Sequence, residues 1–164
     1  MVGRVPPFLN IMKIRSRSVN DTKKTSRRIA RHLKAGDIIC LVGQLGAGKT
    51  VFAKGLAEGL GIKEVEVTSP SFVLVRQYMG GRLPMNHIDL YRLQATRQML
   101  DVGYEDYIYG NAVSVIEWAQ RLEYLMPSEY LKVEISLDTD EKARRIEVSG
   151  VGKRYEELLK ELKE

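Results

Sequence analysis

Eight consecutive residues, Gly43 to Thr50, have the types and the spacing of a phosphate-binding loop. Their sequence, GQLGAGKT, matches G-x-x-x-x-G-K-[ST] at every fixed position. In such a loop, backbone N–H groups surround phosphate oxygens, the lysine reaches the β- and γ-phosphates, and the hydroxyl group holds Mg²⁺. We therefore predict a catalytic role for Lys49 and a metal-binding role for Thr50. The residues expected to bind the nucleotide are Gln44, Leu45, Gly46, Ala47, Gly48, Lys49, Thr50 and Val51.

Two acidic residues could complete this site. A phosphate-binding loop needs an acid at the end of a neighbouring strand, to hold Mg²⁺ or to orient the attacking water. Asp89 follows MNHI, which contains two polar residues, whereas Glu117 closes AVSVI, which has the apolar character of a central parallel strand. Because a buried parallel strand carries its last residue to the phosphate end of the sheet, we favour Glu117 as the acid near the metal. Asp89 is the alternative, and a surface salt bridge is the simpler interpretation of either.

Other residues are weaker candidates. The segment TSPSF, residues 68–72, places three hydroxyl groups around a proline, where they could sense a γ-phosphate or form an ordinary loop. His87 has no second ligand at metal-binding spacing, so we expect it to make a structural hydrogen bond. Trp118 follows Glu117 directly and is expected to pack in the core beside a bound nucleotide. Cys40 lies in the apolar run DIICLV and is expected to be a buried core residue.

The surrounding segments predict an α/β fold in which a mostly parallel sheet is flanked by helices, as in P-loop NTPases. The phosphate-binding loop lies between the apolar strand DIICLVG and a helix that Gly61 ends. An earlier helix is expected to begin at Asn20 or Asp21 and to stop at Gly36. The other expected elements are an edge strand over 12–18, a hairpin of 71–79 with 83–91, a helix over 95–102, a strand from 112, an antiparallel hairpin of 130–138 with 144–150, and a last helix over 153–164.

Length and composition indicate one soluble domain. The 164 residues contain no apolar run approaching 18 residues, so we expect no membrane span. The single cysteine excludes a disulfide framework within the chain, which fits the cytoplasm. We assign residues 12–164 to one P-loop ATPase domain and treat 1–11 as a possible N-terminal extension, because Met12 opens the segment MKIRSRSVND. The first residues make a poor signal peptide.

The positive charge is concentrated at one end of the chain. Residues 1–34 contain ten Lys and Arg against one Asp, a balance of +9, and the remainder carries −4. Such a patch could face an acidic partner, either a protein or RNA. The alternative is a solvated face of a strand and a helix.

Four segments together resemble a known family. GQLGAGKT, TSPSF, HIDLYRL and IEW, in this order and at these separations, are similar to the bacterial TsaE (YjeE) family. That family consists of small P-loop ATPases required for making threonylcarbamoyladenosine in tRNA, and the match spans about residues 18–150. The resemblance implies ATP and Mg²⁺ as cofactors, TsaB and TsaD as partners, and contact with tRNA through their complex. It also implies an ATPase that is weak alone and stimulated by its partners.

The resemblance also implies roles for individual residues. Thr50 and Glu117 take the positions of the family's Mg²⁺ ligands, and Asp89 takes that of its Walker-B-like aspartate. Thr22 and Lys142 are nearest to the family's adenine contacts. The residues that fall in its switch-like loop are Thr68, Ser69 and Ser71. The sequence departs from the family pattern at Gln44, Ser71 and Ala119, where the family often has aspartate, threonine and proline.

Two other functions remain open on the sequence. One is a small-molecule kinase, although no lid-like insertion rich in arginine follows Glu117. The other is a nucleotide-dependent binding module without useful turnover, which would dock through the basic N-terminal face. Phosphate transfer to an acceptor would identify the kinase, and turnover stimulated by partners would distinguish the ATPase from the binding module.

Overall fold

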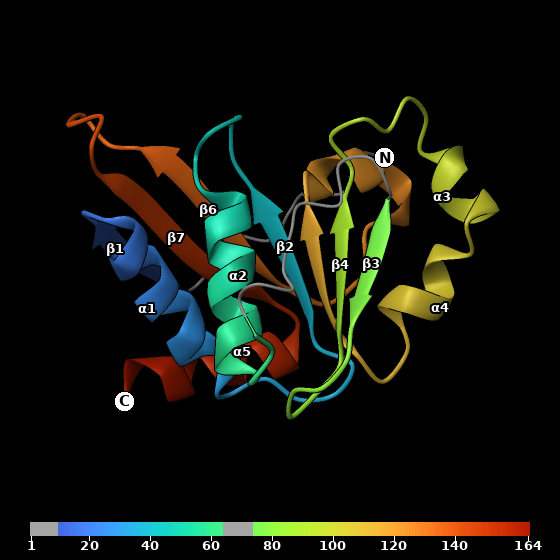
Figure 1. Ribbon diagram of the computed structural model, residues 1–164, viewed down its shortest axis with the longest axis horizontal. Coiled ribbons are helices and arrows are strands. Elements are labelled where there is room, and N and C mark those ends of the chain that lie inside the picture. The colour runs from blue at the N-terminus through green and yellow to red at the C-terminus, as the bar shows by residue number, and fades with distance from the viewer. Residues whose placement is uncertain (1–9, 64–73) are drawn as a thin grey trace.

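The computed structural model describes residues 10–63 and 74–164, which form a seven-stranded sheet with helices packed on it (Figure 1). The strands are β1 (Ile11–Ser16), β2 (Ile38–Val42), β3 (Val75–Tyr78), β4 (Met85–Asp89), β5 (Val113–Glu117), β6 (Tyr130–Leu137) and β7 (Arg144–Val151). The helices are α1 (Val19–Ala30), α2 (Lys49–Gly59), α3 (Arg97–Asp101), α4 (Tyr104–Ile108), the 3-10 segment η2 (Ala119–Leu125) and α5 (Lys153–Lys163).

The strand order is β1-β7-β6-β2-β5-β4-β3. The strands pair in parallel at the centre of the sheet and antiparallel toward both edges. β2 pairs in parallel with both β5 and β6, and β4 pairs in parallel with β5. The outer pairs, β1 with β7, β6 with β7 and β3 with β4, are antiparallel. The expected α/β fold is therefore confirmed, with its parallel strands at the centre and an antiparallel hairpin near the C-terminus.

Both faces of the sheet are covered at its centre, and β2 shows why its sequence is apolar throughout. Ile39 and Leu41 join the cluster packed with α1, α2 and α5. Ile38 and Cys40 join the opposite cluster with α3, α4 and η2. Cys40 is fully buried, as expected, and burial raises the pKa of its thiol. Within residues 10–63 and 74–164, no helix combines the length and apolar character needed to cross a membrane.

Helix α2 carries the phosphate-binding loop at its start. Gly48 has φ 111°, a backbone conformation that favours glycine, and the helix begins at the next residue. At the other end Gly61 has φ 84°, its N–H donates to the carbonyl of Glu58, and the N–H of Ile62 donates to that of Ala57. These two bonds form a Schellman motif, so the predicted stop at Gly61 is confirmed.

Helix α1 begins and ends earlier than predicted. Its N-cap is Ser18, whose hydroxyl accepts a hydrogen bond from the backbone N–H of Asp21 at 3.0 Å. The Asp21 carboxylate in turn accepts from the N–H of Arg17, also at 3.0 Å. The predicted cap at Asn20 or Asp21 is wrong because Asp21 is the third helical residue of this capping box. The helix ends at Ala30, so Gly36 belongs to the following turn.

The short helix predicted over 95–102 is confirmed as α3, and a second short helix that was not predicted, α4, follows it. α3 ends at Asp101, and α4 starts at Tyr104. Gly103, between them, has φ 67°, so the backbone leaves the helical conformation there. Both helices lie over the same side of the sheet as η2, where Met99, Tyr104 and Ile108 are buried.

Glycines inside α2 allow it to approach α1 closely. A Cβ atom on Gly55 would overlap the hydroxyl of Ser26 and lie 2.9 Å from backbone atoms of Lys23. One turn later, a Cβ on Gly59 would lie 2.8 Å from the carbonyl oxygen of Arg27. Glycine costs about 1 kcal/mol relative to alanine inside a helix, so the close packing of the two helices must outweigh that cost.

We therefore expect Gly55→Ala to destabilise the protein. The gain of about 1 kcal/mol in helix propensity should be smaller than the overpacking cost of about 1–3 kcal/mol, because backbone atoms of Lys23 cannot move aside. Urea unfolding would measure the change in the free energy of unfolding. Adding Ser26→Ala should recover only part of the loss, since it removes the hydroxyl and leaves the backbone contact. A Gly55→Ala variant as stable as the wild type would contradict this account.

Candidate active site

The carboxyl ends of β2, β4 and β5 meet at one end of the sheet, beside the start of α2 (Figure 1). Asp89, the last residue of β4, lies opposite Glu117, the last residue of β5. A hollow of about 420 Å³ opens at this point. Its lining residues are Leu45, Gly46, Gly48, Lys49, Thr50, Val51, Asp89, Tyr91, Arg92, Glu117 and Trp118. The structure therefore brings most of the predicted site residues together.

Lys49 is held inside the loop to which it belongs. Its ammonium nitrogen donates to the carbonyl oxygens of Gly43 at 2.6 Å and Gln44 at 2.7 Å. The same nitrogen lies 4.3 Å from the ring centre of Trp118, so the residue is only 5% exposed. Burial lowers the pKa of Lys49, and the negative charges of Glu117 and Asp89 oppose that lowering. Gln44 itself is exposed and does not line the hollow.

Glu117 is a buried carboxylate fixed from two sides. One oxygen accepts a hydrogen bond from the Thr50 hydroxyl at 3.0 Å. The other lies 3.0 Å from Nε2 of His87, and the glutamate is only 2% exposed. These contacts place the two predicted metal ligands, Thr50 and Glu117, against each other.

His87 supports this carboxylate from within the sheet. It lies on β4, the strand next to β5, and its side chain is fully buried. The predicted structural hydrogen bond of His87 is confirmed, and its partner is Glu117. Its Nδ1 atom has no hydrogen-bond partner among the described residues. Sequence reasoning missed this partnership, because only the pairing of β4 with β5 brings the two side chains together.

Asp89 lies beside Glu117 but makes different contacts. One of its carboxylate oxygens accepts a hydrogen bond from the backbone N–H of Tyr91 at 2.9 Å, and the side chain is nearly buried. This contact shapes the turn that follows β4. The Thr50 hydroxyl donates to Glu117, and the choice of Glu117 over Asp89 as the acid near the metal stays a prediction.

Trp118 enters the same hollow as Glu117, although neighbouring residues of a regular strand point to opposite faces. The strand ends at Glu117, and Trp118 takes a left-handed backbone conformation with φ 59°. This turn places the indole against the Lys49 ammonium, and the ring of Tyr91 lies 5.1 Å away between centroids. A non-glycine residue at positive φ is uncommon and costs free energy, which the surrounding contacts must offset.

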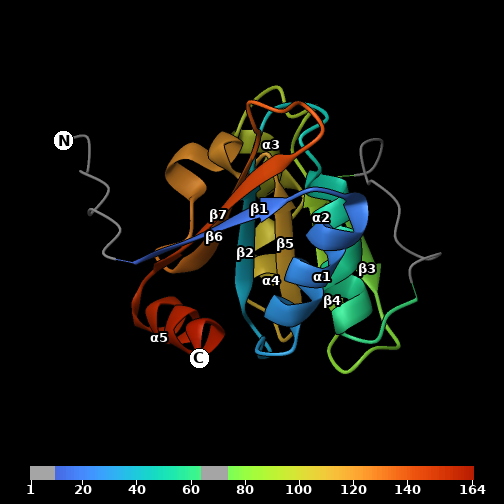
Figure 2. The same cartoon turned by 90° about the vertical axis from the view of Figure 1, so that its left-hand side faces the viewer.

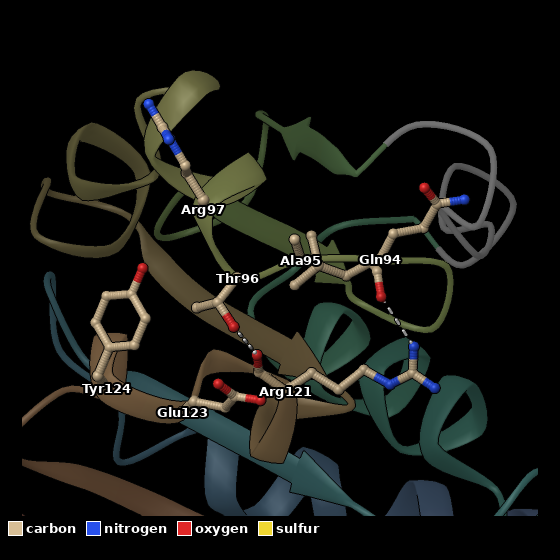
Figure 3. A pocket seen from close by; sticks show the side chains of 8 residues that line it. Gln94, Ala95, Thr96, Arg97, Arg121, Glu123 and Tyr124 are labelled. Carbon is tan, nitrogen blue, oxygen red and sulfur yellow. Dashed lines mark hydrogen bonds between the residues drawn. The ribbon is translucent and has the colours of Figure 1, made fainter.

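Arg121 connects Trp118 to the turn after β4. Its guanidinium lies 5.5 Å from the Trp118 ring and 5.7 Å from the Tyr91 ring. It also donates to the carbonyl oxygens of Leu90, Tyr91 and Leu93. Figure 3 shows its long side chain crossing the floor of a second hollow, of about 450 Å³, below Gln94 and Thr96. Sequence reasoning gave Arg121 no role, because its contacts cross between distant segments.

Thr22 and Lys142 meet at a smaller hollow of about 170 Å³. Gly46, Gly48 and Val51 line both this hollow and the larger one, so the two adjoin at the loop. The Thr22 hydroxyl is within 2.7 Å of the Ser16 hydroxyl and is nearly buried, whereas Lys142 is exposed.

Arg144 also lines this smaller hollow and was missed in the sequence. Its guanidinium donates to the Ala47 carbonyl oxygen at 3.1 Å and to that of Gly46 at 3.5 Å. The hairpin of β6 and β7 therefore holds the phosphate-binding loop from the side. The predicted switch residues Thr68, Ser69 and Ser71 lie outside the described residues.

The geometry agrees with the comparison to known proteins. The family model of "Threonylcarbamoyl adenosine biosynthesis protein TsaE" matches residues 16–146. The chain is 40% identical over 151 residues to "tRNA threonylcarbamoyladenosine biosynthesis protein TsaE" of Bacillus subtilis (strain 168), covering 92% of this chain and 93% of that protein. It is 41% identical over 129 residues to the protein of the same name from Treponema pallidum (strain Nichols), covering 79% and 94%.

A solved structure extends this similarity to the fold. The crystal structure of Bacillus subtilis YdiB superposes with a TM-score of 0.80 at 37% sequence identity, covering 94% of this chain and 95% of that one. The matched residues 16–146 include the phosphate-binding loop, Asp89 and the Glu117-Trp118 pair. From its family match, its relatives and its fold, the chain belongs to the TsaE family of tRNA threonylcarbamoyladenosine biosynthesis proteins.

Proposed function

We propose that this protein binds and hydrolyses ATP, with Mg²⁺, as a cytoplasmic accessory to threonylcarbamoyladenosine modification of tRNA, together with TsaB and TsaD. The observation that carries this proposal is the hydrogen bond between Thr50 and the buried Glu117, directly beside Lys49. A hollow in which the hydroxyl and ammonium of the loop meet a carboxylate from β5 has the groups needed to hold a metal-bound triphosphate.

The loop and the start of α2 would hold the phosphates. The first N–H groups of a helix have no partner within it, and the positive end of the helix dipole favours an anion there. Lys49 would leave the carbonyl oxygens of Gly43 and Gln44 to reach the β- and γ-phosphates. Its charge would then oppose the negative charge that develops in the transition state.

The protein side chains proposed to hold Mg²⁺ are Thr50 and Glu117. The described residues contain no group of three or more His, Cys, Asp and Glu side chains that could enclose a metal ion. Mg²⁺ usually takes few protein ligands and completes its coordination with phosphate oxygens and water, so this pair fits the ion. We assign Asp89, the neighbouring buried carboxylate, the role of accepting a hydrogen bond from the attacking water or from water on the metal.

Trp118 offers a direct test of nucleotide binding, because it is the only tryptophan in the chain. Its ring now faces the Lys49 ammonium at 4.3 Å. When Lys49 moves to the phosphates, this contact should break and the emission of Trp118 should change. We expect the change to saturate with ATP or ADP. It should be larger with Mg²⁺, because the metal would attract the carboxylate of Glu117, the residue next to Trp118.

Two controls define this measurement. Trp118→Phe should remove the signal and identify it as coming from the indole. Calorimetry on the wild type should give the same nucleotide affinity as the fluorescence titration. If calorimetry detects ATP binding while the emission of Trp118 stays constant, the nucleotide does not bind beside Trp118. The assignment of the adjacent Glu117 as a Mg²⁺ ligand would then also be wrong.

Hydrolysis itself requires a separate experiment. ATP turnover should be low for the protein alone and should rise when purified TsaB and TsaD are added. ATP binding without turnover under any of these conditions would identify a nucleotide-dependent binding module. Phosphate transfer to a small molecule, instead of release as inorganic phosphate, would identify a kinase.

A further inference from the structure

The basic residues of α1 divide into two sets with different surroundings. Lys23 and Arg27 face α2, where their side chains lie 3.0 Å and 2.8 Å from the two carboxylate oxygens of Glu58. Glu58 is mostly buried in this contact, so the two cations hold α1 against α2. Glu58 supplies one negative charge to these two cations, so their charge is partly offset within the protein.

The second set lies on the exposed surface of the helix. Lys24, Arg28 and Arg31 are exposed and spaced at i, i+4 and i+7, which places them on one face of the helix. Lys24 and Arg31 make no ion pair or hydrogen bond with the described residues. Arg28 donates one hydrogen bond to the carbonyl oxygen of Leu162 at the end of α5. Figure 2 views the molecule from this side, with α1 toward the viewer.

These side chains form a groove that we call the α1 basic groove. Its volume is about 430 Å³, and its lining residues are Lys24, Thr25, Arg27, Arg28 and Arg31. The groove is thus lined by four cations and one hydroxyl, with no apolar or acidic side chain among the described residues. A phosphate chain is the ligand that complements this composition, because Arg, Lys and Thr are common donors to phosphate oxygens.

A protein partner fits the α1 basic groove less well. Protein interfaces usually have an apolar centre with aromatic anchors, and charged residues are depleted there. Interfaces with nucleic acid are more polar and much more positively charged. We propose that the α1 basic groove binds the phosphate backbone of RNA. That the RNA is tRNA follows from the proposed function. That the groove binds phosphate groups follows from its own side chains.

The test uses the full-length protein and an unmodified, fluorescently labelled tRNA transcript, without nucleotide. Anisotropy titrations between 50 and 200 mM KCl should give an association constant that falls as salt rises. For three phosphate contacts, the slope of its logarithm against that of the salt concentration should be about −2 to −3. Lys24→Glu with Arg31→Glu should weaken binding at 50 mM KCl by about tenfold or more and should flatten this slope.

A matched control separates the groove from overall charge. Arg76 on β3 and Arg97 on α3 are also exposed, and Figure 1 shows both of these elements on the right, away from α1 on the left. Arg76→Glu with Arg97→Glu therefore changes the net charge by the same amount and should leave tRNA binding close to that of the wild type. Circular dichroism should show that both double variants remain folded, because Lys24, Arg31, Arg76 and Arg97 are all exposed.

Three outcomes would overturn the proposal. The wild type could fail to bind tRNA, both double variants could lose the same affinity, or the groove variant could bind tRNA as the wild type does. In the third case, a groove variant that no longer associates with TsaB and TsaD would identify the groove as a protein-docking surface. Because the tRNA titration contains no nucleotide, it does not depend on the proposed ATPase: a failure of nucleotide binding would show in the Trp118 titration, and a failure of hydrolysis would show in the turnover assay.

Discussion

Lys49→Ala is expected to reduce partner-stimulated ATP hydrolysis by about 10²–10³-fold, the range typical of removing one preorganised electrostatic contact to a transition state. Lys49 is the one lysine of the phosphate-binding loop, and its ammonium lies within the candidate nucleotide hollow. Alanine keeps the helix that begins at this position but cannot neutralise charge on the phosphates. Release of inorganic phosphate in the presence of TsaB and TsaD would measure the loss.

Lys54 provides a matched lysine for this experiment. It lies on the same helix, does not line either hollow at the loop and is half-buried. Lys54→Ala should hydrolyse ATP at close to the wild-type rate. Circular dichroism should show that both variants remain folded. Wild-type hydrolysis by Lys49→Ala would exclude this loop as the site of ATP hydrolysis.

The sequence predicts the loop well because its information is local. The glycines, the lysine and the hydroxyl of the loop are consecutive, and each acts through the backbone conformation of its own segment. The pairing of Asp89 with Glu117 is less local, yet it follows once β4 and β5 are recognised as parallel neighbours that end at the same edge. The preference for Glu117 used only the apolar character of its strand, and it stays a prediction.

Other parts of the site depend on contacts between segments that are distant in the sequence, and no local sequence pattern predicts such contacts. The positive φ of Trp118 turns the indole into the hollow, whereas a regular strand would have pointed it away. Arg121 and Arg144 act on carbonyl oxygens of segments distant in the sequence, and arginine at those positions is indistinguishable from a surface charge. The division of the basic residues of α1 likewise depends on Glu58, which lies on another helix.

The ends of the helices were also predicted less well than the helices themselves. Ser18 and Asp21 form a reciprocal cap, and several polar residues near the start of α1 could each have served as the N-cap. The short helix α4, which follows Gly103 and its positive φ, was not predicted, because five residues carry too little periodicity to indicate a helix. The position of a helix end therefore depends on which of several suitable local side chains makes the capping hydrogen bond, which the sequence alone does not decide.

Replacing Glu117 by glutamine tests the metal assignment with the least change in shape. Glutamine keeps an oxygen that can accept the hydrogen bond of Thr50, but it removes the negative charge that would hold Mg²⁺. We expect the affinity for ATP in the presence of Mg²⁺ to fall by at least about 10–100-fold, since even residues that only orient metal ligands contribute that much. Thr50→Val, which removes the hydroxyl while keeping the branched shape, should reduce the affinity in the same direction.

The measurement with EDTA decides whether these losses concern the metal. Without Mg²⁺, binding relies on the loop and Lys49, so Glu117→Gln should bind ATP about as well as the wild type or better, because a negative charge near the phosphates has been removed. Glu117→Ala is a poorer probe, since it also leaves a cavity beside the buried His87. If Glu117→Gln loses the same factor in affinity with and without Mg²⁺, its carboxylate does not hold the metal, and Asp89 on the neighbouring strand becomes the acid to test.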